Sequence, residues 1–99
     1  MGYLGVSATD LDAVTASRLG LSVSVGALVQ SVVSGSPAAQ AGIGRYVVIT
    51  AVNGHAVTST NDLGLAIHTH KPGQQIQVTW VDQNGRHTAT VSLMSGPPA

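Results

Sequence analysis

The chain of 99 residues contains no cysteine and no phenylalanine, and it carries few charges of either sign. Without cysteine, neither a disulfide framework nor a thiolate metal site can form. One tryptophan and two tyrosines offer little surface on which nucleic-acid bases could stack, and four Lys/Arg are balanced by four Asp/Glu, so the sequence has no basic patch. We therefore expect no nucleic-acid partner.

Long apolar runs and catalytic motifs are also missing. Gly, Ser or Thr interrupt the apolar stretches, so no segment approaches the roughly 20 apolar residues that cross a bilayer, and no membrane insertion is expected. No serine lies in a Gly-x-Ser-x-Gly or Gly-Asn-Ser-Gly context, and the glycines form no phosphate loop or dinucleotide fingerprint. These absences predict a non-enzymatic protein without a cofactor.

The four histidines do not suggest a metal site. His68 and His70 stand two positions apart, which on a helix separates their side chains by about 200°, so they are poorly placed to share one ion. His55 follows a predicted turn and His87 precedes a predicted strand, where solvated side chains are usual. We expect no bound metal and some sensitivity of ligand binding to pH near neutrality.

Apolar residues make up 43% of the chain and are mostly Val, Ala, Leu and Ile, which fits one domain with an aliphatic core. Alternating apolar and polar residues predict five strands, at residues 3–8, 27–33, 47–52, 76–81 and 88–93. The Asn84-Gly85 pair is typical of tight turns, so the last two strands are expected to form an antiparallel hairpin.

Two or three helices are predicted between the strands, over residues 10–19, about 37–42 and about 60–70. In the first, the apolar positions are Leu11, Val14 and Leu19. The second begins with a capping Ser36 before Pro37. The third has Ser59 as its cap and Asp62 three residues later, which is a variant of the capping box.

The third helix has an apolar stripe with two possible uses. Four residues at helical spacing fall on one face: Leu63, Ala66, Ile67 and His70. One interpretation is core packing against the sheet, which we favour for Leu65 and part of Ile67. The other is that Leu63 and Ala66 form one wall of a groove whose opposite wall is the strand at residues 5–8.

The most informative motif is Tyr3-Leu4-Gly5-Val6. A glycine between apolar residues at the head of a strand leaves successive backbone N–H groups able to converge on a carboxylate, beside apolar side chains. Taken alone, the tetrapeptide is equally typical of a strand with a close backbone approach.

Two further segments follow in order, at residues 35–43 (Gly-Ser-Pro-Ala-Ala-Gln-Ala-Gly-Ile) and 52–54 (Val-Asn-Gly). With the first motif, they resemble the PDZ domain attached to bacterial HtrA-like serine proteases, over roughly residues 2–94. The resemblance implies an α+β fold, a five- to six-stranded antiparallel barrel or sandwich that is partly open and capped by two to three helices. Residues 95–99 are expected to form a disordered tail.

The resemblance also implies a function, which is binding of protein C-termini by strand addition to residues 5–8. The amides of Leu4, Gly5 and Val6 would hold the terminal carboxylate. The last ligand residue would be apolar, and its side chain would be enclosed by Leu4, Val6, Leu63 and Ile67. The groove would be lined by Tyr3, Ser7, Ala8, Leu63, Ala66, Ile67 and His70. In the parent protein the domain would regulate or supply a protease, in the periplasm or cell envelope or as a secreted protein.

One segment departs from the family pattern. HtrA-like PDZ domains usually carry a glycine, often followed by aspartate, just before the strand that leads to the Val-Asn-Gly segment, and these positions are Tyr46 and Val47 here. If the glycine serves a turn with positive φ, tyrosine costs about 1–2 kcal/mol there. Either the turn is rebuilt around Gly44, or stability is given up for contact area.

The composition of this segment is typical of an interface, and the whole run is expected to be exposed: Arg45, Tyr46, Val47 and Val48. Two interpretations remain open. In the first, the tyrosine arose by natural drift and its ring lies over a neighbouring strand. In the second, the run is another binding surface, natural or engineered, for a folded protein partner.

Overall fold

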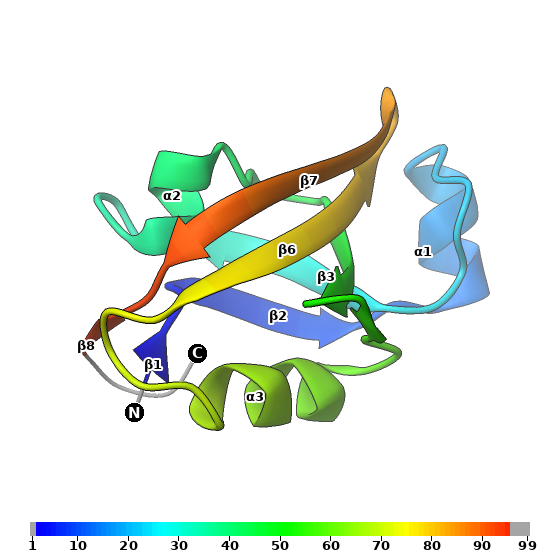
Figure 1. The fold of residues 1–99 in the computed structure, drawn as a ribbon. Coiled ribbons are helices and arrows are strands. Elements are labelled where there is room, and N and C mark those ends of the chain that lie inside the picture. Colours follow the sequence, from blue (N-terminus) through cyan, green and yellow to red (C-terminus); the bar gives the residue numbers. More distant parts are fainter. Residues whose placement is uncertain (1, 96–99) are drawn as a thin grey trace.

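The structure is a computed structural model that describes residues 2–95. Its main feature is a curved antiparallel sheet (Figure 1). Five strands follow one another across the sheet: β2 (Val6–Asp10), β3 (Ala27–Val32), β4 (Val48–Val52), β6 (Gln75–Asp82) and β7 (Gly85–Ser92). A short strand, β5 (His55–Ala56), pairs with β4. The ends of the domain meet in a second small sheet, β1 (Gly2–Tyr3) with β8 (Met94–Ser95).

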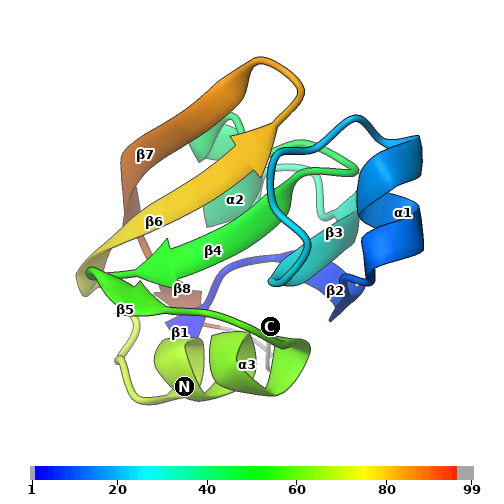
Figure 2. The ribbon, with the colours of Figure 1, turned by 90° about the vertical axis from the view of Figure 1, so that its right-hand side faces the viewer.

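Three helices cover this sheet: α1 (Ala13–Arg18), α2 (Pro37–Ala41) and α3 (Thr60–His68). Figure 2 shows α1 beside the β2 and β3 end of the sheet, and α3 lies along β2 in both views. The predicted fold class is confirmed, since the sheet is antiparallel, open and capped by helices. Within residues 2–95, no helix is both long and apolar enough to span a bilayer.

The predicted hairpin is confirmed as β6 and β7. Asp82 pairs directly with Gly85, so the two turn residues are Gln83 and Asn84, one position earlier than an Asn-Gly turn would place them. The Asn84 N–H donates to Asp82 Oδ1 at 2.8 Å. This is an Asx-turn, in which an Asp side chain accepts from the backbone amide two residues later.

The predicted first strand, residues 3–8, is wrong as a single element. The chain breaks between β1 and β2 at Leu4 and Gly5, where Gly5 has a φ of 91°. The Leu4 carbonyl accepts a hydrogen bond from the Ala38 amide of α2 at 2.9 Å, so it is bonded to a helix N-terminus and not to a neighbouring strand.

The first helix is shorter than predicted because its expected first turn belongs to other elements. Asp10 continues β2, and Asp12 is the N-cap, with its Oδ1 accepting from the Thr15 amide at 2.7 Å. Val14, predicted as an apolar contact, is 63% exposed, and Ala16 is the buried residue of α1.

The caps of the other two helices are as predicted. Ser36 Oγ accepts from the Ala39 amide, Pro37 opens α2, and Gly42 ends it with a φ of 87°. Ser59 Oγ accepts from the Asp62 amide at 3.2 Å and caps α3. This helix ends at His68, two residues before the predicted end.

The core divides into two clusters. The larger one lies between the sheet and α3 and includes Leu4, Val6, Leu63, Ile67 and Trp80. The smaller one holds α1 in place and consists of Leu11, Ala16, Leu28 and Val48. Ser95, which begins the predicted tail, lies in β8, and residues 96–99 lie outside the described residues.

Candidate functional site

Strand β2 is the edge of the main sheet, and β3 is its one strand neighbour within residues 2–95. The Gly5 carbonyl accepts from the Val33 amide at 2.8 Å, and the Leu11 amide donates to the Gly26 carbonyl at 3.0 Å. Because hydrogen-bonded and non-hydrogen-bonded pairs alternate in an antiparallel ladder, these two bonds mean that Val6, Ala8 and Asp10 direct their N–H and C=O groups away from β3. The outer edge of β2 therefore offers three residues with backbone groups available for another strand.

The Leu4-Gly5 loop lies at the head of this edge. Within residues 2–95, neither the Leu4 nor the Gly5 amide donates a hydrogen bond. The Val6 amide is directed outward as well, so three successive N–H groups are available next to apolar side chains. Successive unpaired amides of this kind bind anions in many proteins.

Gly5 is required at this position for two reasons. Its φ of 91° is a backbone conformation that residues with a side chain rarely adopt. In addition, a Cβ atom built on Gly5 would lie 2.2 Å from the Cβ of Ser36. Ser36 is itself fixed, since it is 2% exposed and caps α2. The loop and the start of α2 are therefore packed directly against each other.

Helix α3 lies opposite the outer edge of β2, and it is joined to β2 at one end. Asp10 Oδ1 accepts a hydrogen bond from the Thr60 amide at 2.7 Å, which links the last residue of β2 to the first residue of α3. Sequence reasoning missed this role because it assigned Asp10 to a helix. The alternation of Val6, Ala8 and Asp10, with Asp12 as a better cap, is the signal that would have revealed it.

Four of the residues predicted to enclose a terminal side chain are brought together: Leu4, Val6, Leu63 and Ile67 belong to one cluster. Each is 5% exposed or less, and Ala8 packs against them. Tyr3 is half-buried in β1, and Ser7 is exposed on the other side of β2. The apolar layer between β2 and α3 is therefore closely packed.

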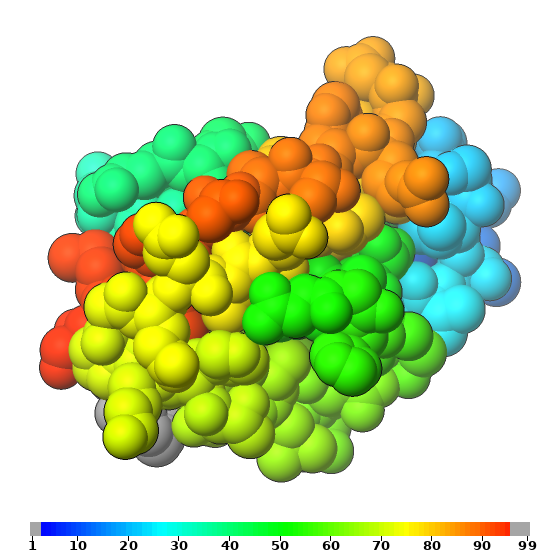
Figure 3. All heavy atoms as spheres, in the orientation of Figure 1, coloured from blue at the N-terminus to red at the C-terminus, as the bar shows by residue number. Residues whose placement is uncertain are grey.

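The predicted core position Leu65 is wrong, because its side chain is 58% exposed. Leu65 and Ala66 instead line a hollow of about 390 Å³ between α3 and the β4–β5 turn. Figure 3 shows this face, with β5 in green next to α3 in yellow-green.

His70 also lines this hollow and lies beyond the end of α3. Its Nδ1 is 2.7 Å from the Ala66 carbonyl, and its Nε2 is 3.3 Å from Asn53 Nδ2. Asn53 Oδ1 accepts from the Gln77 amide, so Asn53 directs its NH₂ group toward the ring. His70 is thus held beside the β4–β5 turn instead of continuing the helix.

Asp62 on α3 and Asp82 at the hairpin have hydrogen-bond partners, whereas His68 Nε2 on α3 is buried without one among residues 2–95. Hydrogen bonds from the Thr58 hydroxyl and amide hold the pKa of Asp62 below its usual value. A hydrogen bond from His87, whose ring stacks on Trp80, lowers the pKa of Asp82. Among residues 2–95, no three His, Asp or Glu side chains gather as metal ligands would.

Tyr46 has the backbone conformation that the family glycine predicts, with a φ of 66°. Gly44 is not among the residues with positive φ, so the turn is not rebuilt around it. The Tyr46 amide donates to the Val29 carbonyl at 2.7 Å, and the Val29 amide donates to the Val47 carbonyl at 2.8 Å. These two bonds to β3 hold Tyr46 in the left-handed conformation.

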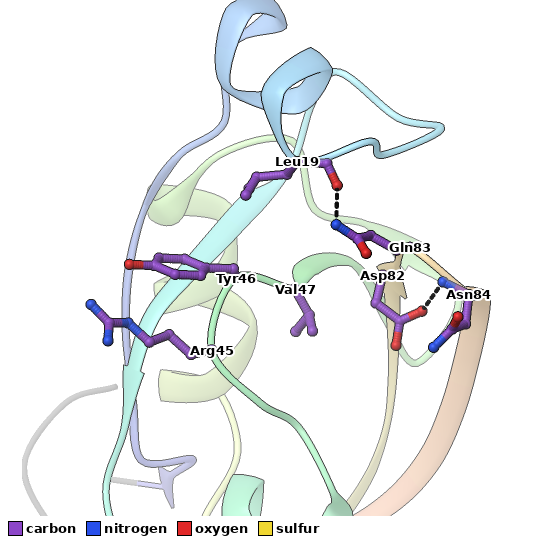
Figure 4. Close-up of a pocket in the computed structure, with 7 residues that line it drawn as sticks. All are labelled: Leu19, Arg45, Tyr46, Val47, Asp82, Gln83 and Asn84. Atoms are coloured by element: carbon purple, nitrogen blue, oxygen red, sulfur yellow. Dashed lines mark hydrogen bonds between the residues drawn. The ribbon is translucent and has the colours of Figure 1, made fainter.

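The predicted exposed run at residues 45–48 is only half exposed. Val47 and Val48 are buried, at 8% and 0% exposure, because they enter the two core clusters. Tyr46 is 43% exposed, and the Arg45 guanidinium lies 4.6 Å from the centre of its ring. Figure 4 shows both side chains extending in the same direction, beside a hollow of about 360 Å³ that also reaches the β6–β7 turn.

The chain is similar to a known protein family and to several known proteins. The PDZ domain family matches residues 2–93. Serine protease Do-like HtrA of Lactococcus lactis subsp. lactis (strain IL1403) is 38% identical over 95 residues, which are 91% of this chain and 23% of that protein. A probable periplasmic serine endoprotease DegP-like of Rhizobium meliloti (strain 1021) is 40% identical over 96 residues, which are 96% of this chain and 18% of that protein.

Solved structures share the fold. The HtrA-type protease AlgW with decapeptide superposes with a TM-score of 0.87 at 26% identity, covering 99% of this chain and 30% of that one. The HtrA3 PDZ domain bound to a phage-derived ligand (FGRWV) has a TM-score of 0.78 at 22% identity, covering 94% of this chain and 86% of that one.

Proposed function

Because the chain belongs to the PDZ domain family, we propose that it binds free protein C-termini by strand addition to β2. It matches the PDZ domains of HtrA-type and DegP-like serine proteases. A PDZ domain is a peptide-binding module, and the chain is not itself a protease, because the family match occupies residues 2–93. The observation that carries the proposal is the outer edge of β2, with unpaired amides at Leu4 and Gly5.

In this proposal the ligand lies antiparallel to β2, between the strand and α3. The amides of Leu4, Gly5 and Val6 donate to the terminal carboxylate, and the outward N–H and C=O groups of Ala8 bond the residue two before the end. The terminal side chain contacts the apolar layer that includes Leu63 and Ile67, which favours Val, Leu, Ile or Ala. The AlgW relative was solved with a decapeptide, which supports a peptide ligand.

The chain spans 23% and 18% of the two relatives compared above, which are named as serine proteases. We propose that the domain regulates such a protease, by presenting substrates or by relaying its own occupancy. The DegP-like relative is named as periplasmic, which supports a location in the periplasm or cell envelope.

Binding should depend on the free carboxylate. We expect amidation of the C-terminus of an apolar-ended peptide to weaken binding at least about tenfold, because hydrogen bonds to a charged group contribute about 1.5–3 kcal/mol. The measurement is calorimetric titration of matched free-acid and amide peptides. Acetylation of the N-terminus, which also removes one charge, is the control and should change affinity little. Equal affinity for acid and amide would exclude carboxylate recognition.

A second candidate function is binding of a folded protein through the Arg45, Tyr46 and Val47 surface. The observation that favours it is a tyrosine in the left-handed conformation that is 43% exposed and lines a hollow, since backbone strain of this kind is retained at functional sites. In this function the Tyr46 ring is the anchor, because partly buried aromatic side chains supply much of the binding energy at interfaces.

Tyr46→Gly tests this second function. We expect the substitution to stabilise the domain by about 0.5–1 kcal/mol, since glycine adopts a positive φ without the side-chain penalty. Tyr46→Ala is the matched control, because it removes the ring but keeps the strain. Urea unfolding measures both variants, and no gain for Tyr46→Gly would contradict the strain argument. A folded partner should lose about tenfold or more in affinity for either variant, while peptide binding is unchanged.

A further inference from the structure

Asp10 occupies the far end of the edge that is proposed to receive the peptide. Its Oδ1 accepts from the Thr60 amide at 2.7 Å, and the carboxylate remains exposed to solvent at the end of β2. Within residues 2–95, no hydrogen bond to Asp10 Oδ2 is found. One carboxylate oxygen therefore holds α3, and the other is available to a ligand.

The backbone register places Asp10 opposite a definite ligand position. Between Ser7 and Ala8 the pairing shifts from Ser31 to Val29, so the extra residue of the bulge, Gln30, belongs to β3. Strand β2 therefore alternates without interruption along its outer edge. If the last ligand residue pairs with Val6, as the proposed function requires, the residues two and four before the end pair with Ala8 and Asp10.

Directly paired residues of antiparallel strands have their side chains on the same face, with Cβ atoms about 4.5–5.5 Å apart. The side chain four residues before the ligand terminus would therefore lie beside the Asp10 carboxylate. A second carboxylate, on Asp62, lies at the same end of α3 and is bonded to Thr58. The Asp10 carboxylate therefore favours a positive charge at this ligand position.

We propose that Asp10 is a specificity-determining residue, which selects Lys or Arg four residues before the C-terminus of the ligand. This inference rests on the proposed function, because it uses the register that carboxylate capture sets. The preference is modest, since the pair is exposed and the Asp10 charge already interacts with the N-terminus of α3.

The test is a titration series with free-acid peptides that differ only at this position, carrying Lys, Gln or Glu. We expect Lys to bind about two- to fivefold more tightly than Gln, and Glu to bind more weakly than Gln. In Asp10→Asn the preference for Lys over Gln should disappear. The asparagine retains an oxygen for the Thr60 amide, so the charge is removed while the hydrogen bond is kept.

Asp12→Asn is the matched control. Asp12 also accepts from a helix amide at 2.7 Å, on Thr15 of α1, so the same charge is removed two residues away, at the start of α1 and not on β2. The Lys preference should persist in this variant. Equal binding of Lys and Gln peptides to the unaltered domain would overturn the inference, whether or not the variants fold, and so would a Lys preference that survives in Asp10→Asn.

The amide peptides separate this inference from the proposed function. Loss of binding on amidation, together with no charge preference, would refute the role of Asp10 and leave carboxylate capture intact. Equal binding of acid and amide would refute both.

Discussion

Replacing Gly5 with alanine is expected to destabilise the domain by about 2–5 kcal/mol. The positive φ of 91° costs an alanine about 1–2 kcal/mol, and the added methyl group would overlap Ser36, for which overpacking typically costs about 1–3 kcal/mol. Ser36 has little room to move, because it is buried and its hydroxyl caps α2. The free energy of unfolding in urea measures the effect.

Gly20→Ala is the control for the backbone contribution. Gly20 has a φ of 68°, and a Cβ atom there meets nothing within 4 Å, so we expect a cost of about 1 kcal/mol. The difference between the two variants isolates the contact between the Leu4-Gly5 loop and Ser36. Similar costs for both would show that the loop has room for a side chain, which the structure does not allow.

The second large effect concerns α3. Ile67→Ala is expected to cost about 2–5 kcal/mol, because the side chain is 1% exposed in the main core and its removal leaves a cavity. Leu65→Ala, two residues earlier in the same helix, should change stability by less than about 0.5 kcal/mol, since Leu65 is 58% exposed. Thermal or urea unfolding distinguishes the two. Comparable losses would mean that the helix presents a different face to the sheet.

These two α3 residues show why the candidate site was only partly predictable. The apolar spacing placed Leu63 and Ile67 on one face, and both are buried, but Leu65 was predicted as core and is 58% exposed. A helix of nine residues with several apolar positions has more than one plausible buried face, and the sheet beneath it decides between them.

The segment around Tyr46 was also only partly predictable from the sequence. The sequence left open whether the turn is rebuilt around Gly44 or keeps a positive φ at Tyr46, and the φ of 66° at Tyr46 decides between the two. The burial of Val47 and Val48 was missed, because nothing within the run distinguishes a residue that enters the core from one that leaves it. The pairing with β3 makes that choice.

By itself, the sequence determined the caps of α2 and α3, the β6–β7 hairpin and the family, because each depends on residues a few positions apart or on a motif. Tertiary structure alone decided that the Leu4 carbonyl is bonded to α2, that Val47 and Val48 are buried and that Asp10 is joined to Thr60. Those features depend on which segments, up to 50 residues apart, come to lie side by side. Local propensity carries no information about such neighbours, since packing of the whole chain selects them.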